Sequence, residues 1–128
     1  MVNKEHAVKI ARQFIKEVLP DEDWYKTTEP SVKAILLYGS VTKGTNRDDS
    51  DIDILVILPL KVEEKYTTGE YFYDYQKQKI NVVLRSIERL RDTAKKHKDK
   101  AEKEVFKDSV IIESDKETKA LLGQISSI

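Results

Sequence analysis

The stretch LLYGSVTKGTNRDDSDIDILVIL, residues 36–58, decides the fold of this 128-residue chain. One apolar run ends there at Gly39-Ser40, and a second begins ten residues later at Asp51-Ile52-Asp53. Residues two positions apart on a β-strand project to the same side of the sheet, which places Asp51 and Asp53 side by side. Two such carboxylates repel each other unless a cation lies between them. The stretch therefore predicts two strands that carry an acidic pair to a site.

The composition limits the class of protein. Lys+Arg and Asp+Glu both number 23, so there is no net charge to attract nucleic acid or an anionic membrane. With 39% hydrophobic and 36% charged residues, we expect residues 1–128 to form a single globular domain with a charged surface. The absence of cysteine excludes disulfides and thiolate metal sites. Because no signal-like or membrane-spanning apolar run is found, we expect a cytoplasmic protein.

The hydrophobic pattern predicts an α/β (α+β) fold, a mixed sheet with helices on one face. An amphipathic helix is expected over residues 6–19, ending at Pro20. A hairpin is expected with Lys77-Gln78 as its turn, and Ser114 with Glu117 predicts a capping box for a final helix. The remaining expected elements are strands over 32–38, 51–58 and 110–114, and helices over 86–98 and 99–109.

The loop after the first strand resembles a phosphate cradle. Gly39 permits a sharp turn and a close backbone approach, and Ser40 supplies a hydroxyl and an N–H group. Lys43 and Arg47 could neutralise phosphate charge, although the loop lacks the Lys-Ser/Thr ending of the Walker type. The adjacent carboxylates suit Mg²⁺, which often shares its oxygen ligands with substrate phosphates. The alternative is that Asp51 and Asp53 are only the solvent-exposed start of a strand. The spacing of Gly39-Ser40 and the two aspartates, taken together, favours the binding site.

Gly39-Ser40, ten residues and then Asp51-Ile52-Asp53 resemble the signature of the DNA polymerase beta nucleotidyltransferase superfamily, in its minimal nucleotidyltransferase branch. The resemblance covers residues 31 to about 115 and implies a polymerase-beta-like core. It implies transfer of a nucleoside monophosphate, expected to be AMP from ATP, to a hydroxyl of a small molecule or protein with release of pyrophosphate. It also implies that Gly39 and Ser40 bind the triphosphate, while Asp51 and Asp53 hold Mg²⁺ or Mn²⁺.

The chain departs from this family at the third carboxylate, whose position is occupied by Asn81. A neutral amide can offer a carbonyl oxygen to a metal ion but cannot accept a proton. If Lys77-Gln78 is a two-residue turn, Asp74 pairs with Asn81 and projects beside it. One hypothesis is that Asp74 replaces the missing carboxylate. The other is that Asp74 is a solvated hairpin charge, and a one-residue change of register would turn it to the opposite face.

Partners and alternative functions follow from two features. Leu55 and Ile57 share the side of the aspartates, so we expect an exposed apolar patch that marks an interface. The resemblance implies a homodimer or a separate helical HEPN-type partner, as a two-subunit enzyme or as the antitoxin of a toxin–antitoxin pair. The alternative function is a nucleotide-binding or partner-binding module whose catalysis is weak because of Asn81. The lack of a basic groove argues against a template-dependent polymerase.

Overall fold

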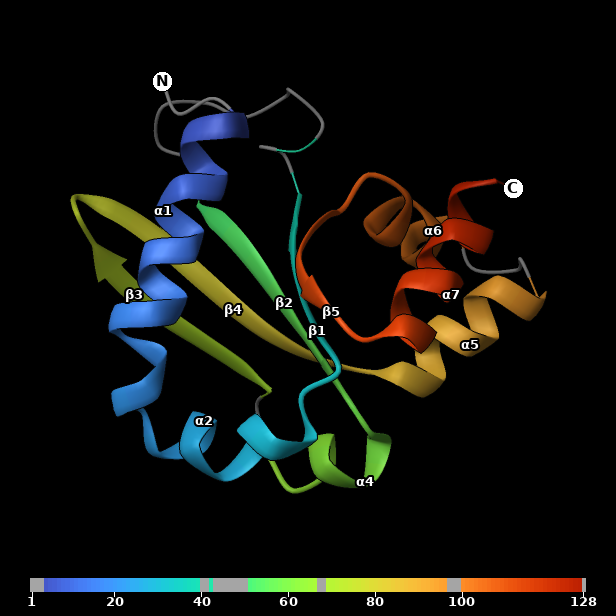
Figure 1. Ribbon diagram of the computed structural model, residues 1–128, viewed down its shortest axis with the longest axis horizontal. Helices are drawn as coiled ribbons and strands as arrows, with labels where there is room; N and C mark the ends of the chain where they lie inside the picture. The colour runs from blue at the N-terminus through green and yellow to red at the C-terminus, as the bar shows by residue number, and fades with distance from the viewer. Residues whose placement is uncertain (1–3, 40–41, 43–50, 67–68, 97–99, 128) are drawn as a thin grey trace.

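The computed structural model describes residues 4–39, 42, 51–66, 69–96 and 100–127. A five-stranded sheet of order β3-β4-β2-β1-β5 forms its centre (Figure 1). The described elements are α1 (Lys4–Glu17), η1 (Leu19–Asp21), α2 (Asp23–Thr28), η2 (Glu29–Ser31), β1 (Ala34–Tyr38), β2 (Ile52–Leu58), α4 (Leu60–Glu63), β3 (Glu70–Tyr75), β4 (Gln78–Ser86), α5 (Ile87–Lys96), α6 (Lys100–Lys107), β5 (Val110–Ser114) and α7 (Lys116–Ser126). Among the described helices, none combines the length and the apolar character needed to cross a membrane.

Strand β2 lies in the middle of the sheet. It pairs antiparallel with β1 and parallel with β4, which confirms the predicted mixed sheet. Its sequence is almost continuously apolar after Asp53, as expected for a strand that is covered on both faces. The strand therefore joins the acidic pair at its start to the core of the molecule.

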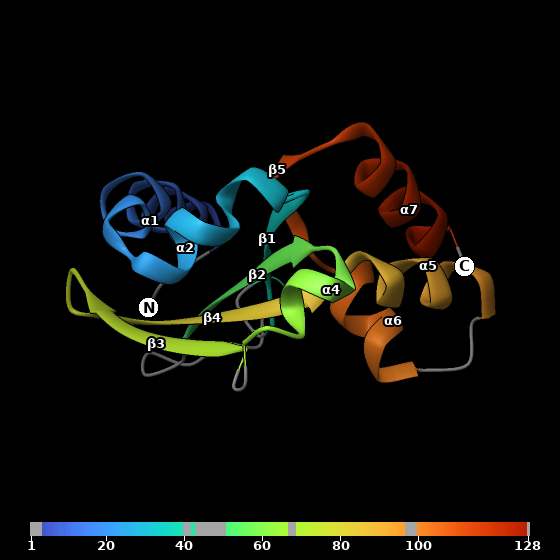
Figure 2. The ribbon, with the colours of Figure 1, turned by 90° about the horizontal axis from the view of Figure 1, so that it is seen from below.

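One face of the sheet packs against α1 and α2, as Figure 2 shows. The helical spacing of Ala7, Ile10, Ala11 and Phe14 gives α1 a buried apolar stripe. Phe14 is fully buried, and its ring meets the rings of two β3 tyrosines edge-on. This packing holds the β3-β4 hairpin against the N-terminal helix.

The other face is covered over part of its length by α5, α6 and α7 (Figure 2). Leu55 and Ile57 are 0% exposed and belong to the same core as Leu90, Phe106 and Leu122. The exposed apolar patch expected at Leu55 and Ile57 is therefore wrong, because the chain's own C-terminal helices bury it. Helices pack against both faces of the sheet, and not only against one as the sequence indicated.

The β3-β4 hairpin has a different turn from the predicted one. Gln76 and Lys77 are its central residues, with positive φ angles of 50° and 64°, as in the two-residue turns that suit hairpins. Asp74 consequently pairs with Lys79, and Phe72 is the residue opposite Asn81. The predicted pairing of Asp74 with Asn81 is wrong by two residues, so Asp74 keeps its expected face but lies nearer the turn.

The start of α7 also differs from the expected capping box. Asp115 is the N-cap residue, and its Oδ1 accepts a hydrogen bond from the Thr118 N–H at 2.8 Å. Ser114 instead donates its hydroxyl hydrogen to the Asp115 carbonyl oxygen at 2.8 Å. The helix therefore begins one residue later than the Ser114–Glu117 pattern predicts.

Candidate functional site

Polar side chains gather on the face of the sheet beyond the part that α5, α6 and α7 cover. Because β1 and β2 are antiparallel, the end of β1 meets the start of β2, and Tyr38 pairs with Asp53. Because β2 and β4 are parallel, the same Asp53 pairs on its other side with Asn81. The register thus places the Asp53 carboxylate between two neighbouring strands, two residues before the buried Leu55.

Gly39 brings the backbone directly against this carboxylate. A Cβ atom at position 39 would lie 2.4 Å from Oδ2 of Asp53, and the φ angle of Gly39 is +85°, so both space and conformation require glycine. The Gly39 carbonyl accepts hydrogen bonds from the Thr42 backbone N–H at 3.2 Å and from the Thr42 hydroxyl at 2.8 Å. The chain therefore turns sharply at the acidic pair, as the motif predicts.

Three further residues predicted to bind phosphate cannot be placed relative to this turn. Ser40, Lys43 and Arg47 lie outside the described residues.

The environment of Asp53 disfavours its negative charge. The pKa of Asp53 is raised to about 6, mainly by burial and also by the negative charges of Asp51 and Glu70, while a hydrogen bond from Asn81 acts in the opposite direction. Burial and the charge of Asp53 likewise raise the pKa of the Tyr38 hydroxyl to about 12. A cation at this position would relieve the repulsion between the carboxylates.

Asn81 contacts a carboxylate that the motif does not predict. Its Nδ2 donates a hydrogen bond to Oε1 of Glu70 at 3.1 Å. Its Oδ1 is buried and has no hydrogen-bond partner among the described residues. Glu70 pairs with Val83 at the start of β3, which puts it on the same face as Asn81. The alternation of residues in β3 would have revealed Glu70 if the turn at Gln76-Lys77 had been recognised.

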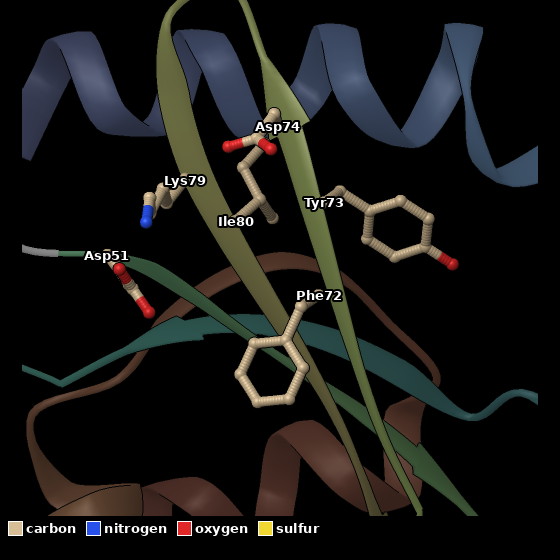
Figure 3. Close-up of a pocket in the computed structure, with 6 residues that line it drawn as sticks. All are labelled: Asp51, Phe72, Tyr73, Asp74, Lys79 and Ile80. Atoms are coloured by element: carbon tan, nitrogen blue, oxygen red, sulfur yellow. The ribbon is translucent and has the colours of Figure 1, made fainter.

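Asp74 lies in a shallow pocket beside the acidic pair. The pocket has a volume of about 430 Å³, and it is lined by Asp51 from the start of β2 and by five residues of β3 and β4: Phe72, Tyr73, Asp74, Lys79 and Ile80 (Figure 3). Phe72 is 70% exposed, which is unusual for so large an apolar side chain. The pocket therefore offers an aromatic surface next to Asp51, and it holds Asp74 opposite Lys79 rather than opposite Asn81.

The donor atoms at this site fit a hard divalent cation. Carboxylate oxygens and an amide carbonyl oxygen are its usual ligands, and Oδ1 of Asn81, although buried, has no hydrogen-bond partner among the described residues. Among the residues that the structure describes, no group of three or more His, Cys, Asp or Glu side chains is gathered closely enough to hold a metal ion. Mg²⁺ is commonly bound through one or two carboxylates, with substrate phosphates completing the shell. The carboxylates and the amide of this site are therefore ligands of the kind that such an ion takes, and further oxygen ligands would complete its shell.

Comparison with known proteins agrees with this geometry. The fold resembles the crystal structure of a nucleotidyltransferase-like protein from Exiguobacterium sibiricum, with a TM-score of 0.62 and 13% identity. That match covers 93% of this chain but 38% of the other, so the likeness concerns the fold alone. No curated protein matches the chain. Residues 25–121 match the family described as nucleotidyltransferase domain, and the chain therefore belongs to this polymerase-beta-like family.

Proposed function

We propose that this protein transfers a nucleoside monophosphate from a nucleoside triphosphate, with ATP the expected donor, to an acceptor hydroxyl. The family is one of transferases that generally use a nucleoside triphosphate and a divalent metal ion. The observation that carries the proposal is the carboxylate of Asp53, which is half-buried beside Asp51 and lies against the backbone of Gly39. The acceptor is a hydroxyl of a small molecule or of a protein.

The described residues have separate roles in this proposal. Asp51 and Asp53 hold Mg²⁺ or Mn²⁺, which when bound neutralises phosphate charge and polarises the phosphoryl group under attack. Gly39 leaves room for the triphosphate to approach the backbone, and Asn81 orients Asp53 through its hydrogen bond. Ser40, Lys43 and Arg47 lie outside the described residues, and the motif predicts that they bind the phosphates.

The reaction forms one bond to phosphorus and breaks another. The acceptor oxygen attacks the α-phosphorus, the bond from the α-phosphorus to the bridging oxygen breaks, and pyrophosphate leaves with the bonding electron pair. The acceptor proton passes to a carboxylate or to water. Such reactions depend mainly on alignment and charge stabilisation, so the protein contributes by placing the groups. With its pKa at about 6, Asp53 is mostly ionised at neutral pH, which is the form that binds a metal ion.

Calorimetric titration with ATP, with and without Mg²⁺, tests this function. We expect Mg²⁺-dependent binding that is lost in Asp53→Asn, because the amide removes the charge that holds the ion. Asp21→Asn is the matched control, since Asp21 is an exposed acidic residue in the connection between α1 and α2. Equal affinity of the wild-type protein and Asp53→Asn would contradict the metal mechanism. Transfer of label from α-labelled ATP to acceptors in a cell extract then measures turnover.

A nucleotide-binding module without turnover is the second candidate, and Asn81 is the observation that favours it. The family's third carboxylate is replaced there by an amide, which cannot accept the acceptor proton. Mg²⁺-dependent ATP binding with no labelled product and no pyrophosphate from any extract would support this candidate.

The partner implied by the resemblance stays a prediction of its own. It is a second copy of the chain or a helical HEPN-type protein, with the chain acting as one subunit of an enzyme or as an antitoxin. Because α5, α6 and α7 bury Leu55 and Ile57, such a partner has to bind elsewhere on the chain. The molar mass in solution, measured by light scattering, tests the homodimer.

A further inference from the structure

We propose that Glu70 supplies the carboxylate that Asn81 lacks, so that the metal site of this protein is built from β2, β3 and β4. The inference rests on the proposed function, since it assigns a ligand to the same metal-dependent site. It differs from the family pattern in placing the third acidic group on the edge strand of the sheet, next to the strand that carries Asn81.

The sheet register brings Glu70 and Asp53 to the two sides of Asn81. Asn81 pairs with Asp53 on β2 and with Phe72 on β3. Glu70 is two residues before Phe72, so its side chain shares the face of Asn81 as a diagonal neighbour. Diagonal Cβ atoms are about 7 Å apart, a distance that a glutamate side chain can span. Three neighbouring strands therefore direct Asp53, Asn81 and Glu70 to one surface.

The contacts of Asn81 connect the two carboxylates. Its Nδ2 lies 3.1 Å from Oε1 of Glu70, and its side chain also donates a hydrogen bond to Asp53. A neutral amide thus lies between two anionic groups, where a cation would interact with both. The buried Oδ1 of Asn81 has no partner among the described residues, although buried polar atoms are normally hydrogen-bonded or bound to a ligand. The amide nitrogen faces both carboxylates in this structure, so a rotation of the Asn81 amide by about 180° would turn Oδ1 toward an ion held by Glu70 and Asp53.

Glu70 can reach the ion only by moving its side chain. The described acidic residues are not gathered into a closed metal site, and Glu70 is exposed at the start of β3. Rotation about its side-chain torsion angles would exchange the hydrogen bond of Glu70 with Asn81 for a contact with the ion, and glutamate has one methylene more than aspartate with which to reach it. The assignment therefore requires the Glu70 side chain to rotate toward the ion when the ion binds.

Asp74 is the internal comparison for this assignment. It lies on the same strand and the same face as Glu70, and it is likewise an exposed acidic residue. Its direct neighbour across the hairpin is Lys79, whose positive charge competes with a metal ion for the carboxylate. Glu70 and Asp74 thus differ in their position relative to Asn81 and in the residue opposite them, which is Val83 for Glu70 and Lys79 for Asp74.

The experiment measures Mn²⁺ binding to the full chain from the electron paramagnetic resonance signal of the free ion. Titrations are made with Mn²⁺ alone and with Mn²⁺ plus a non-hydrolysable ATP analogue. We expect Glu70→Gln to weaken Mn²⁺ binding in the presence of the analogue by about tenfold or more. Asp74→Asn should bind as the wild-type protein does. Adding Asn81→Asp to Glu70→Gln should restore binding, because it returns a carboxylate to the centre of the site.

Wild-type affinity in Glu70→Gln, with binding lost in Asp53→Asn, would overturn the role of Glu70 and leave the proposed function intact. Failure of the wild-type protein to bind Mn²⁺ with the analogue would overturn both. Equal losses in Glu70→Gln and Asp74→Asn would also overturn the assignment, because a general loss of negative charge would then explain them. Urea unfolding of each variant shows whether a loss of Mn²⁺ binding comes from misfolding. If Glu70→Gln is misfolded, Glu70→Asp serves as the second variant, and we expect it to retain part of the Mn²⁺ binding.

Discussion

Replacing Asp53 with Asn should stabilise the metal-free protein at neutral pH, although it removes a residue proposed for the site. Burial, together with the charges of Asp51 and Glu70, raises the pKa of Asp53 from 3.8 to about 6. A shift of roughly two pH units corresponds to an upper bound of about 3 kcal/mol, at about 1.4 kcal/mol per unit. Because the carboxylate is partly exposed, solvent screening reduces the expected gain in unfolding free energy to about 1–2 kcal/mol.

The pH dependence of this gain follows from proton linkage. The folded protein binds the Asp53 proton more tightly than the unfolded chain does, so ionisation of Asp53 destabilises the fold. This destabilisation is absent below the unfolded pKa of 3.8 and complete above the folded pKa of about 6. The wild-type protein should therefore lose stability relative to Asp53→Asn as the pH rises through this window.

Urea unfolding in EDTA, at pH values on both sides of the window, measures the difference. A variant that is less stable than the wild-type protein at neutral pH, or a difference that does not change with pH, would refute the reasoning. Saturating Mg²⁺ and ATP should reverse the order, since a ligand at 100 times its Kd stabilises the protein that binds it by about 2.7 kcal/mol. Only the wild-type protein is expected to gain this unfolding free energy from the ligand.

Three further substitutions test the described structure. Gly39→Ala should abolish metal-dependent ATP binding in calorimetry and cost about 1–3 kcal/mol in urea unfolding, because the new Cβ would collide with the Asp53 carboxylate at 2.4 Å. Leu55→Ala should cost about 2–5 kcal/mol at every protein concentration, since Leu55 is buried within one chain, whereas a concentration-dependent loss would point to an interface. Lys77→Gly should raise stability in thermal unfolding by about 1 kcal/mol, because Lys77 has a φ of +64°, and a loss would contradict the observed turn.

The central part of the fold could be predicted from the sequence because its signals are local and strong. The apolar runs ending at Gly39 and beginning at Ile52 predict two buried strands, and the structure confirms both. The motif also predicts that Gly39 meets the acidic pair, which follows from the antiparallel pairing of Tyr38 with Asp53. The spacing of these residues in the sequence was sufficient to place them, because the geometry of a strand fixes where residues at a given spacing lie.

The hairpin register could not be predicted in the same way. Gln76 and Lys77 adopt positive φ angles without the Asn or Gly that usually signals such a turn, so Lys77-Gln78 was an equally plausible choice from the residues alone. A turn at Lys77-Gln78 pairs Asp74 with Asn81, whereas the observed turn pairs Phe72 with Asn81 and makes Glu70 a diagonal neighbour of Asn81. The contact between Glu70 and Asn81 therefore depends on the hairpin register and is apparent only from the three-dimensional structure.

The burial of Leu55 and Ile57 by the C-terminal helices also could not be predicted from the sequence, for a physical reason. The amphipathic pattern of α5, α6 and α7 shows that each has an apolar side, but not which face of the sheet that side meets. The chain after β4 returns to the face of the aspartates and covers only part of it. Residues on the same side of β2 therefore form a buried core at Leu55 and a half-buried polar site at Asp53.

The central place of β2 has a consequence for hydrogen exchange. Its backbone is hydrogen-bonded to strands on both sides, so we expect its amide hydrogens to exchange only when the whole domain unfolds. A ligand bound through Asp53 would then slow exchange across the entire core by one common factor, and not only near the site. Binding at this site would thus slow the exchange of amide hydrogens on the far side of the sheet, although these amides touch neither the nucleotide nor the ion.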